Sequence, residues 1–349
     1  MTQLFEVKDI DKKFYEEQLK DFLPKKIFDI HTHVWLDKFK IKGEHIANAP
    51  IRSATWPSRV AKDNSVEDLI QTYKLMFPDK QVTPLIFGYP KVNFDIEVSN
   101  NYIKTCAKKH GFPSLILSMP EWSGAELEER ITKGGFLGTK VYLNFAKPYI
   151  PQKEIRIFDF LPIHQLEVLN THQWVVMLHI PRDKRLKDPV NLAQLLEIEH
   201  NYPNIKLIVA HVGRAYCIED VGDAFEVLAE TKKMVFDFSA NSNQSVFEKL
   251  IKAVGPKRIL FGSDMPILRM RTRRMCESGN YVNLVPKGLY GDVSEDGHMR
   301  ELDKVEGDKL TYFMYEEIAA FNRAATSAML KKDDIEDIFY NNAVRLLGL

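Results

Sequence analysis

The sequence predicts an α/β protein built as a (β/α)8 TIM-type barrel, and three observations support this prediction. Eight short apolar runs alternate along the chain with amphipathic segments of helical period. Four of the apolar runs carry histidine or aspartate at their carboxyl ends, the edge at which parallel barrels gather their chemistry. No linker, repeat or low-complexity tract interrupts the pattern, which predicts one domain over residues 1–349.

The predicted elements follow in order along the chain. An N-terminal amphipathic helix at 11–22 precedes the first strand, and C-terminal helices at 309–329 and 333–347 follow the last. The strands are short, apolar and flanked by polar residues, as buried parallel strands are, and are predicted at 26–30, 82–87, 114–118, 136–143, 174–179, 205–211, 234–238 and 258–264. The helices between them are predicted at 66–76, 96–109, 124–132, 158–170, 190–199, 219–229 and 245–253. A doubly wound open sheet is the alternative, but no Gly-rich phosphate loop follows an early strand.

Composition argues against several classes of protein. The chain has 48 Lys and Arg and 48 Asp and Glu, so its formal net charge is zero and favours neither nucleic-acid nor membrane-surface binding. No apolar stretch approaches the ~20 residues of a membrane span. Residues 1–12 lack the apolar centre of a signal peptide, and the three cysteines are scattered. A cytoplasmic protein without a disulfide framework or a cysteine zinc site is therefore expected.

Two connections are longer than the few residues usual in α/β units. One follows the first strand over residues 34–65, and the other follows the eighth over residues 265–308. Because strands 1 and 8 are neighbours in a closed barrel, both connections are expected to lie over the carboxyl face. They are predicted either to form a lid with cationic groups that face an anionic substrate, or to be solvated loops that hold a homo-oligomer contact.

The strongest indication of function is the His31-Thr32-His33 sequence at the end of the first strand. Residues i and i+2 of a strand face the same side, so the two imidazoles are expected to converge on one metal ion. Three further strands end in His179, His211 and Asp264. A single strand-end histidine can simply hydrogen-bond a neighbouring loop, but four strands that end in this way predict a metal site.

The order of these residues, with Lys140 on the fourth strand, resembles the amidohydrolase superfamily of metal-dependent barrel enzymes from residue 29 to the end of the chain. Local sequences are similar to the amidohydrolase-related branch that includes aminocarboxymuconate semialdehyde decarboxylase. They are Gly-Ser-Asp-Met-Pro at 262–266, Ala-His-Val-Gly at 210–213 and the closing Asn-Asn-Ala-Val-Arg-Leu-Leu run at 341–347. These motifs are specific for the superfamily and poorly specific for a substrate.

The resemblance implies one divalent metal bound by His31, His33, His179 and Asp264. Zn²⁺ is the expected ion for three imidazoles and a carboxylate, and Mn²⁺ and Fe²⁺ accept the same ligands. The resemblance also implies a metal-activated water, with Asp264 as the acceptor of its proton. His211 would polarise the substrate carbonyl or transfer a proton. The alternative for His211 is an indirect role through hydrogen bonds that orient a ligand.

Lys140 leaves the number of metals open. In binuclear relatives a lysine on the fourth strand is carbamylated and bridges two ions, whereas the decarboxylase branch is mononuclear. One metal is expected here, with Lys140 near the substrate or in an ion pair. Tyr142 shares the face of Lys140, and Trp35 directly follows the first strand. Three arginines are predicted either to bind a substrate carboxylate or to pair with loop acids: Arg182, Arg214 and Arg269.

These residues predict a metal-dependent enzyme that hydrolyses an ester, lactone or amide bond in a small, carboxylated and therefore anionic molecule. Non-oxidative decarboxylation of an unsaturated or aromatic acid is the alternative, because the metal ligands do not separate the two reactions. A non-catalytic metal-binding protein would need a missing ligand or a blocked mouth, and no ligand is missing from the sequence.

Overall fold

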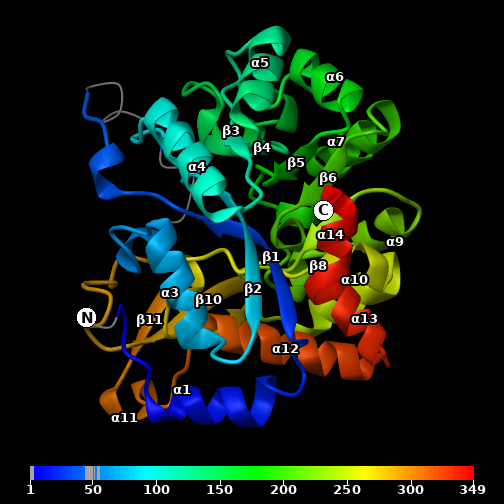
Figure 1. The fold of residues 1–349 in the computed structure, drawn as a ribbon. Coiled ribbons are helices and arrows are strands. Elements are labelled where there is room, and N and C mark those ends of the chain that lie inside the picture. The colour runs from blue at the N-terminus through cyan, green and yellow to red at the C-terminus, as the bar shows by residue number, and fades with distance from the viewer. Residues whose placement is uncertain (1–3, 44–49, 51, 53–55) are drawn as a thin grey trace.

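The computed structural model describes residues 4–43, 50, 52 and 56–349, which form an α/β fold with parallel strands at its centre (Figure 1). β1 (Lys26–His33) pairs in parallel with β2 (Gln81–Phe87). The other central strands form a second parallel sheet in sequence order: β3 (Ile116–Leu117), β4 (Gly138–Val141), β5 (Val175–Leu178), β6 (Lys206–Val209), β7 (Val235–Asp237) and β8 (Ile259–Leu260). The predicted strands are therefore present in the predicted order.

Single parallel bridges connect the two sheets at both of their edges. Ile86 on β2 pairs with Ser114, just before β3, and Thr32 on β1 pairs with Met265, which follows β8. The backbone amide of Ile30 also donates to the carbonyl of Phe261 at 3.0 Å. As a result, the carboxyl ends of β1 and β8 lie side by side.

Helices connect successive strands, as the alternating sequence pattern predicts. Polar side chains cap the first turn of five of them: Ser65 caps α3 (Val66–Met76), Asp95 caps α4 (Ile96–His110), Ser123 caps α5 (Gly124–Gly134), Asp188 caps α7 (Pro189–Asn201) and Asn243 caps α10 (Gln244–Val254).

Two of the helices between strands begin five residues later than the sequence pattern predicts. α6 (Ile163–Thr171) begins only after Pro162, whose ring is tolerated at a helix start but not in its interior. α9 (Ala224–Ala229) begins after Gly222, whose φ of 54° lies in the left-handed region and interrupts the helix. In each helix, a single residue accounts for the late start.

Helices from both ends of the chain cover the strands from outside. The first and last helices are α1 (Asp9–Phe14), which continues as a π-helical turn (Tyr15–Leu19), α12 (Phe313–Ser327), α13 (Lys332–Glu336) and α14 (Asn342–Leu347). Aromatic rings join the C-terminal region to the strand ends. Phe321 stacks on Phe238 with ring centroids 4.2 Å apart, and Phe339 stacks on Phe261 at 5.0 Å.

The second long connection contains a small sheet, which the sequence pattern does not predict. β9 (Arg273–Glu277) pairs antiparallel with β10 (Asn280–Pro286), which pairs in parallel with β11 (Met299–Leu302), and α11 (Lys304–Gly307) follows. We call residues 273–302 the insertion sheet. Ser278 and Gly279 link β9 to β10 with positive φ angles, as a two-residue hairpin turn requires. In the first long connection, residues 44–49, 51 and 53–55 lie outside the described residues.

The expectation about the cysteines needs correction. Cys217, in the loop after β6, forms a disulfide with Cys276 on β9, with the two Cα atoms 5.7 Å apart although 59 residues separate them in sequence. Cys106 is buried and free. The spacing in the sequence does not indicate the pair, because the insertion sheet must first fold back over the loop after β6.

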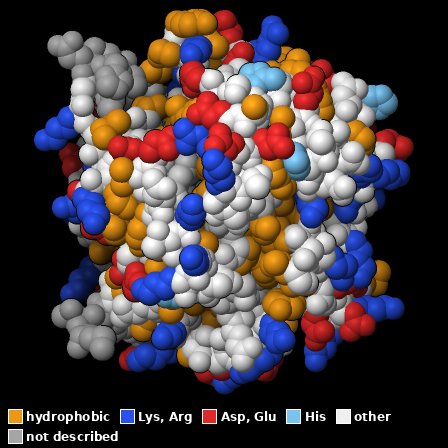
Figure 2. Space-filling view, turned by 45° about the horizontal axis from the view of Figure 1, so that its top comes forward, with side chains coloured by type: hydrophobic (Ala, Val, Ile, Leu, Met, Phe, Trp, Pro, Cys, Tyr) orange, Lys and Arg blue, Asp and Glu red, His pale blue; other side chains and the backbone are white. Residues whose placement is uncertain are grey.

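The molecular surface carries charges of both signs. Figure 2 shows Lys and Arg side chains interspersed with Asp and Glu on one face, in keeping with the zero net charge. Within the described ranges, no helix has the length and apolar character needed to cross a membrane.

A buried ion pair ties α1 to the segment before β9, and its loss should destabilise the protein. Asp11 accepts hydrogen bonds from Nη1 and Nη2 of Arg271, at 2.8 and 2.7 Å, and from Thr311 Oγ1 at 2.8 Å. Asp11→Ala leaves a buried guanidinium without its carboxylate, so we expect the free energy of unfolding, measured in urea, to fall by ~3–5 kcal/mol. Asp9→Ala, on the same helix but exposed, is the control and should leave the curve unchanged. Equal curves for both variants would contradict the prediction.

Candidate metal centre

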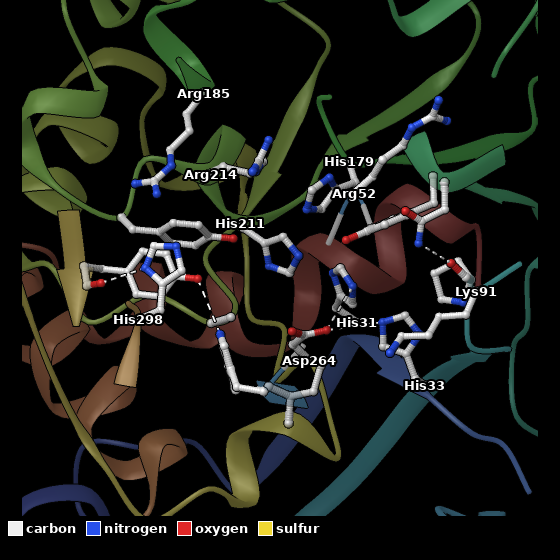
Figure 3. A pocket seen from close by; sticks show the side chains of 18 of the residues that line it. His31, His33, Arg52, Lys91, His179, Arg185, His211, Arg214, Asp264 and His298 are labelled. Carbon is white, nitrogen blue, oxygen red and sulfur yellow. Dashed lines mark hydrogen bonds and ion pairs between the residues drawn. The ribbon is translucent and has the colours of Figure 1, made fainter. Parts of the chain in front are cut away.

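A cavity of about 530 Å³ opens at the carboxyl ends of the central strands (Figure 3). Its lining brings together the residues predicted from the strand ends: His31, His33, His179, His211 and Asp264. The other charged side chains of the described lining are Arg52, Lys91, Lys140, Arg185, Arg214 and Arg274, against Asp183 and Asp296. The cavity therefore carries more cationic than anionic side chains.

His31 and His33 both direct Nε2 at Asp264. His33 Nδ1 donates to the carbonyl of Gly88 at 2.9 Å, so the neutral ring carries its lone pair on Nε2, 3.2 Å from Asp264 Oδ1. His31 Nδ1 lies 2.9 Å from Asp237 Oδ2, and its buried Nε2, without a hydrogen-bond partner in the described part of the chain, lies 3.5 Å from the same Asp264 oxygen. Lone pairs that face a carboxylate repel it unless a cation lies between them. The donor set, with ligand atoms within 4.8 Å of one another, therefore fits a divalent metal.

Burial and neighbouring charges together keep His31, His179, His211 and Asp264 in the protonation states that bind a metal. Removal from water lowers the pKa of His31 to about 3 and holds the pKa values of His179 and His211 below the ordinary value. Burial opposes ionisation of Asp264, but at the acidic pH where this carboxyl titrates the neighbouring imidazoles are protonated, and their positive charge lowers its pKa to about 2. Neutral imidazoles and a carboxylate anion are the forms that coordinate a metal at pH 7.

The backbone holds Asp264 in an unusual conformation. Its φ of 51° lies in the left-handed region, which costs a non-glycine residue ~1–3 kcal/mol. Hydrogen bonds from β1 fix the segment on both sides of it. The amide of Ser263 donates to Asp29 Oδ1 at 2.8 Å, and the amide of His33 donates to the carbonyl of Met265 at 2.9 Å. The strain is thereby retained at the position where a ligand is needed.

His211 and His179 lie next to this group with different partners. His211 Nδ1 is 2.8 Å from Ser239 Oγ and 3.1 Å from the Ser239 carbonyl, and its ring lies 4.7 Å from that of His31. His179 packs on Tyr142 and on His211, with ring centroids 4.4 and 5.3 Å apart. Its buried Nδ1 has no hydrogen-bond partner among the residues described. His179 thus lies beside the tight group of ligand atoms, not within it.

Asp237, at the end of β7, is a site residue that sequence reasoning missed. Its Oδ2 bonds His31 Nδ1, and its Oδ1 accepts from the amides of His211 at 3.0 Å and Ser239 at 3.1 Å. One carboxylate therefore orients a candidate ligand and also positions the histidine of the neighbouring strand. The signal in the sequence is an aspartate inside the apolar run Val-Phe-Asp-Phe at 235–238, where a buried acid needs a partner.

Asp237→Asn should weaken metal affinity ~10–100-fold without unfolding the protein, because an amide holds the His31 ring and its basicity less well than a carboxylate. Competition with a chelating indicator, starting from metal-free protein, measures this affinity. Asp223→Asn, an exposed aspartate after β6, is the control and should bind metal like the wild type. Unchanged affinity in Asp237→Asn would show that the carboxylate does not support the ligand.

Three of the residues predicted to bind substrate line the cavity: Lys140, Tyr142 and Arg214. Lys140 is 1% exposed, and its Nζ has no hydrogen-bond partner among the residues that the structure describes. It lies over the rings of Phe87 and Tyr142, 5.4 and 5.9 Å from their centroids. Burial lowers the pKa of Lys140 to about 8, although the nearby carboxylates oppose the shift. This amine is therefore far more often neutral at pH 7 than an exposed lysine.

Backbone carbonyls, not an acid, hold Arg214. Its Nη1 donates to the carbonyls of Pro181 and Arg182 at 3.0 and 3.1 Å. No carboxylate within the described ranges forms an ion pair with it, in contrast to Arg182 and Arg185. A fixed guanidinium without an acid partner, in the wall of a cavity, suits a carboxylate of a bound molecule.

Trp35 and Arg182 do not reach the cavity lining. The Trp35 ring is buried behind the cavity, where it stacks on Tyr89 with centroids 4.3 Å apart. Arg182 forms an ion pair with Asp188 at 3.4 Å. Trp35 therefore supports Tyr89, a residue of the lining. Arg182 pairs with an acid, which is the alternative predicted from the sequence to binding a substrate carboxylate.

Arg269 is predicted to contact a substrate anion, but its side chain lies outside the cavity lining. The short 3₁₀ turn Ile267–Arg269 brings Ile267 to the cavity and turns Arg269 away from it. The Arg269 guanidinium lies 5.8 Å from the centroid of Phe5, and burial lowers its pKa to about 10. Nearness in sequence to Asp264 does not place this side chain at the site, because one turn reverses its direction.

Residues 28–275 match the sequence model of a protein family described as Amidohydrolase. This range begins in β1 and ends in β9. It contains the candidate metal ligands and stops before most of the insertion sheet. A search of curated protein sequences gives no match.

Solved structures share this fold at low sequence identity. An amidohydrolase from Burkholderia multivorans with bound HEPES is 13% identical, with a TM-score of 0.59 over 93% of this chain and 99% of that one. A probable 2-pyrone-4,6-dicarboxylic acid hydrolase from Acinetobacter baumannii with citric acid bound is 14% identical, with a TM-score of 0.54 over 93% and 99%. A dihydroxybenzoic acid decarboxylase from a Polaromonas species, with bound manganese and the inhibitor 2-nitroresorcinol, is 14% identical, with a TM-score of 0.54 over 93% and 98%.

Proposed function

The chain belongs to the amidohydrolase family and is an enzyme of the amidohydrolase type; from this premise we propose that it hydrolyses an ester, lactone or amide bond in a small carboxylated molecule. One observation carries the proposal. The Nε2 atoms of His31 and His33 converge on one oxygen of Asp264, in a cavity with more cationic than anionic side chains. Such a site is suited to bind a divalent metal and an anionic substrate together.

In this proposal His31, His33, His179 and Asp264 hold one divalent ion. Buried ring nitrogens without hydrogen-bond partners in the described residues, on His31 and His179, support this assignment, because an unsatisfied buried polar atom is costly. Zn²⁺ suits the ligand set, and the manganese in the similar decarboxylase structure makes Mn²⁺ the alternative to test. When bound, such an ion lowers the pKa of a water and polarises a substrate oxygen.

Two side chains are proposed to move protons. Asp264, an anion at pH 7, accepts a proton from the attacking water on a carboxylate oxygen. His211 has its Nδ1 turned to Ser239, so its Nε2 is left to carry that proton to the leaving atom of the substrate. Asp237 holds the proposed metal ligand His31 and the proton carrier His211 in position.

We propose that Arg214 binds the substrate carboxylate. The loss of activity on its replacement should therefore depend on the negative charge of the substrate. Arg214→Met should reduce kcat/KM by an amount equivalent to ~2–5 kcal/mol for a carboxylated substrate, and much less for an analogue with a neutral amide in place of that carboxylate. Arg182→Met, whose guanidinium pairs with Asp188 outside the lining, is the matched control. Equal losses with both compounds would show that Arg214 holds the loop together and does not bind the anion.

A product assay on the metal-loaded protein tests the function itself. One panel holds carboxylated esters, lactones and amides, and a second holds aromatic and unsaturated acids. We expect hydrolysis products from the first panel. Release of CO₂ from the second panel without hydrolysis in the first would replace the proposal with the decarboxylase alternative. Full activity after removal of metal by chelation would contradict both.

We also propose that the parallel strands close into a (β/α)8 barrel and that the chain is one domain. The bridges at both edges of the two sheets, Ile86–Ser114 and Thr32–Met265, support closure.

The cytoplasm stays the predicted location, although a disulfide such as Cys217–Cys276 is typical of oxidising compartments. Titration of free thiols in freshly isolated protein distinguishes the two: the disulfide leaves only Cys106 free.

A further inference from the structure

One end of the cavity is lined by residues that the proposed reaction does not use. Figure 3 places Arg185 and His298 at this end, beyond His211 and away from His33. Tyr281 and His298, from the insertion sheet, also line it. Both follow the range matched to the amidohydrolase family, residues 28–275. Two residues of this wall, Tyr281 and His298, therefore lie outside the range that the family model matches.

Two guanidinium groups share one pair of tyrosine rings at this end. Arg274 lies 5.1 Å from the centroid of Tyr216 and 4.3 Å from that of Tyr281. Arg185 lies 5.2 and 5.3 Å from the same two rings. The rings meet edge to face, with centroids 5.1 Å apart. Two positive charges are thus held near each other in a poorly hydrated place, where their repulsion is strong.

Among the described residues, Arg185 has a carboxylate partner in an ion pair and Arg274 has none. Asp220 pairs with Arg185 at 2.6 Å. Arg274 has neutral partners instead, because it donates to the side-chain oxygen of Asn283 at 2.9 Å and to the carbonyl of Ala240 at 2.5 Å. A buried guanidinium that has only neutral acceptors retains its full attraction for an anion.

Two further acids are near this end of the cavity, and neither forms an ion pair with Arg274 among the described residues. Burial raises the pKa of Glu317 on α12 well above its ordinary value, which favours the uncharged form of this carboxyl. Asp296 lines the cavity, but its Oδ1 accepts from the backbone amide of His298 at 3.0 Å. Within the described residues, Arg274 therefore has neutral hydrogen-bond acceptors and no ion-pair partner.

Tyr281 is fixed in a position to donate. Trp56 Nε1 donates to the Tyr281 hydroxyl at 3.5 Å, which leaves the proton of that hydroxyl for another acceptor. His298 stacks on the Tyr281 ring at 4.1 Å. The disulfide joins the loop of Cys217 to Cys276, which lies opposite Tyr281 in the pairing of β9 with β10. These contacts hold the wall rigid before any ligand binds.

We infer that Arg185, Arg274 and Tyr281 form a second anion-binding subsite that takes a carboxylate at the far end of the substrate. The inference rests on the proposed function, in which Arg214 binds the first carboxylate near the metal. The substrate class is then a dicarboxylate. Ring contacts of 6.4 and 5.1 Å connect His211 to Tyr281 through the Tyr216 ring. Because the Tyr216 ring lies between His211 and Tyr281, we expect a ring or an extended chain between the two acid groups.

Calorimetric titration of the metal-loaded enzyme tests this subsite. The probes are benzoate, with one carboxylate, and isophthalate, terephthalate and 2,6-naphthalenedicarboxylate, whose two carboxylates lie progressively further apart. We expect at least one dicarboxylate to bind ~10-fold or more tightly than benzoate, since a second charge-assisted contact is worth at least that much. Arg274→Met should abolish this advantage and leave benzoate binding unchanged.

Neighbouring residues on the same strand offer a matched control. Arg273 is next to Arg274 on β9, but its side chain is exposed and pairs with Glu316 outside the cavity, so Arg273→Met should keep the advantage. If Arg274→Met does not fold, the pair Arg185→Met with Asp220→Asn removes a cation of the same subsite without leaving an unpaired acid, and should reduce the advantage in the same way.

The outcomes separate the two proposals. Binding of benzoate with no dicarboxylate bound more tightly, or a folded Arg274→Met enzyme that keeps the full advantage, would overturn the second subsite and leave the proposed function intact. Failure of every probe to bind, or benzoate affinity that is unchanged by Arg214→Met, would instead overturn the anionic substrate of the proposed function.

Discussion

Asp264→Ala is expected to remove the bound metal and to reduce activity by ~10³-fold or more. The wild type should contain about one equivalent of a divalent transition metal as purified. Asp264 Oδ1 is the atom on which His31 and His33 converge, so its loss removes the only anionic member of the ligand set. His31→Ala should have the same effect. Elemental analysis together with the hydrolysis assay measures both quantities.

A surface histidine provides the control for this experiment. His200 is exposed on α7, and His200→Ala should keep both metal and activity. A wild-type enzyme that is active without metal would contradict the mechanism. Near two equivalents of metal, together with a carbamylated Lys140, would reject only the single-metal form. The buried, unpartnered Nζ of Lys140 and its pKa of about 8 make this outcome chemically accessible.

His211→Asn is expected to lower turnover by ~10²-fold or more while metal content stays close to that of the wild type. The ring is held by Ser239 and by the backbone bond from the His211 amide to Asp237. Asparagine keeps the backbone bond but loses the nitrogen that carries the proton. Turnover under saturating substrate and metal content are measured on the same sample.

A histidine outside the cavity is the matched comparison for His211. The imidazole of His164 bonds the backbone carbonyl of Trp122, and His164→Asn should change turnover little. Loss of metal in proportion to activity in His211→Asn would make His211 a ligand. That result would agree with its place in a second group of potential ligand atoms, with His31 and Asp237.

The sequence by itself determines the order of strands and helices and the residues that meet at the carboxyl ends of the strands. These features follow from short-range rules. A period of two places His31 and His33 on one face. Strands that are buried on both faces are continuous apolar runs, so His179, His211 and Asp264 stand out at the ends of such runs. The same period of two places Lys140 on β4 and Tyr142, just after it, on one side, and both line the cavity.

The tertiary structure alone decides the contacts between residues far apart in the chain. Asp237 bonds His31 across 206 positions, and Cys217 reaches Cys276 only because the insertion sheet folds back over the loop after β6. A single turn after Asp264 directs Arg269 away from the cavity, while Arg274 enters it from a strand that the sequence pattern does not reveal. Periodicity describes a residue's neighbours along one element, whereas the direction of a loop side chain depends on packing between elements.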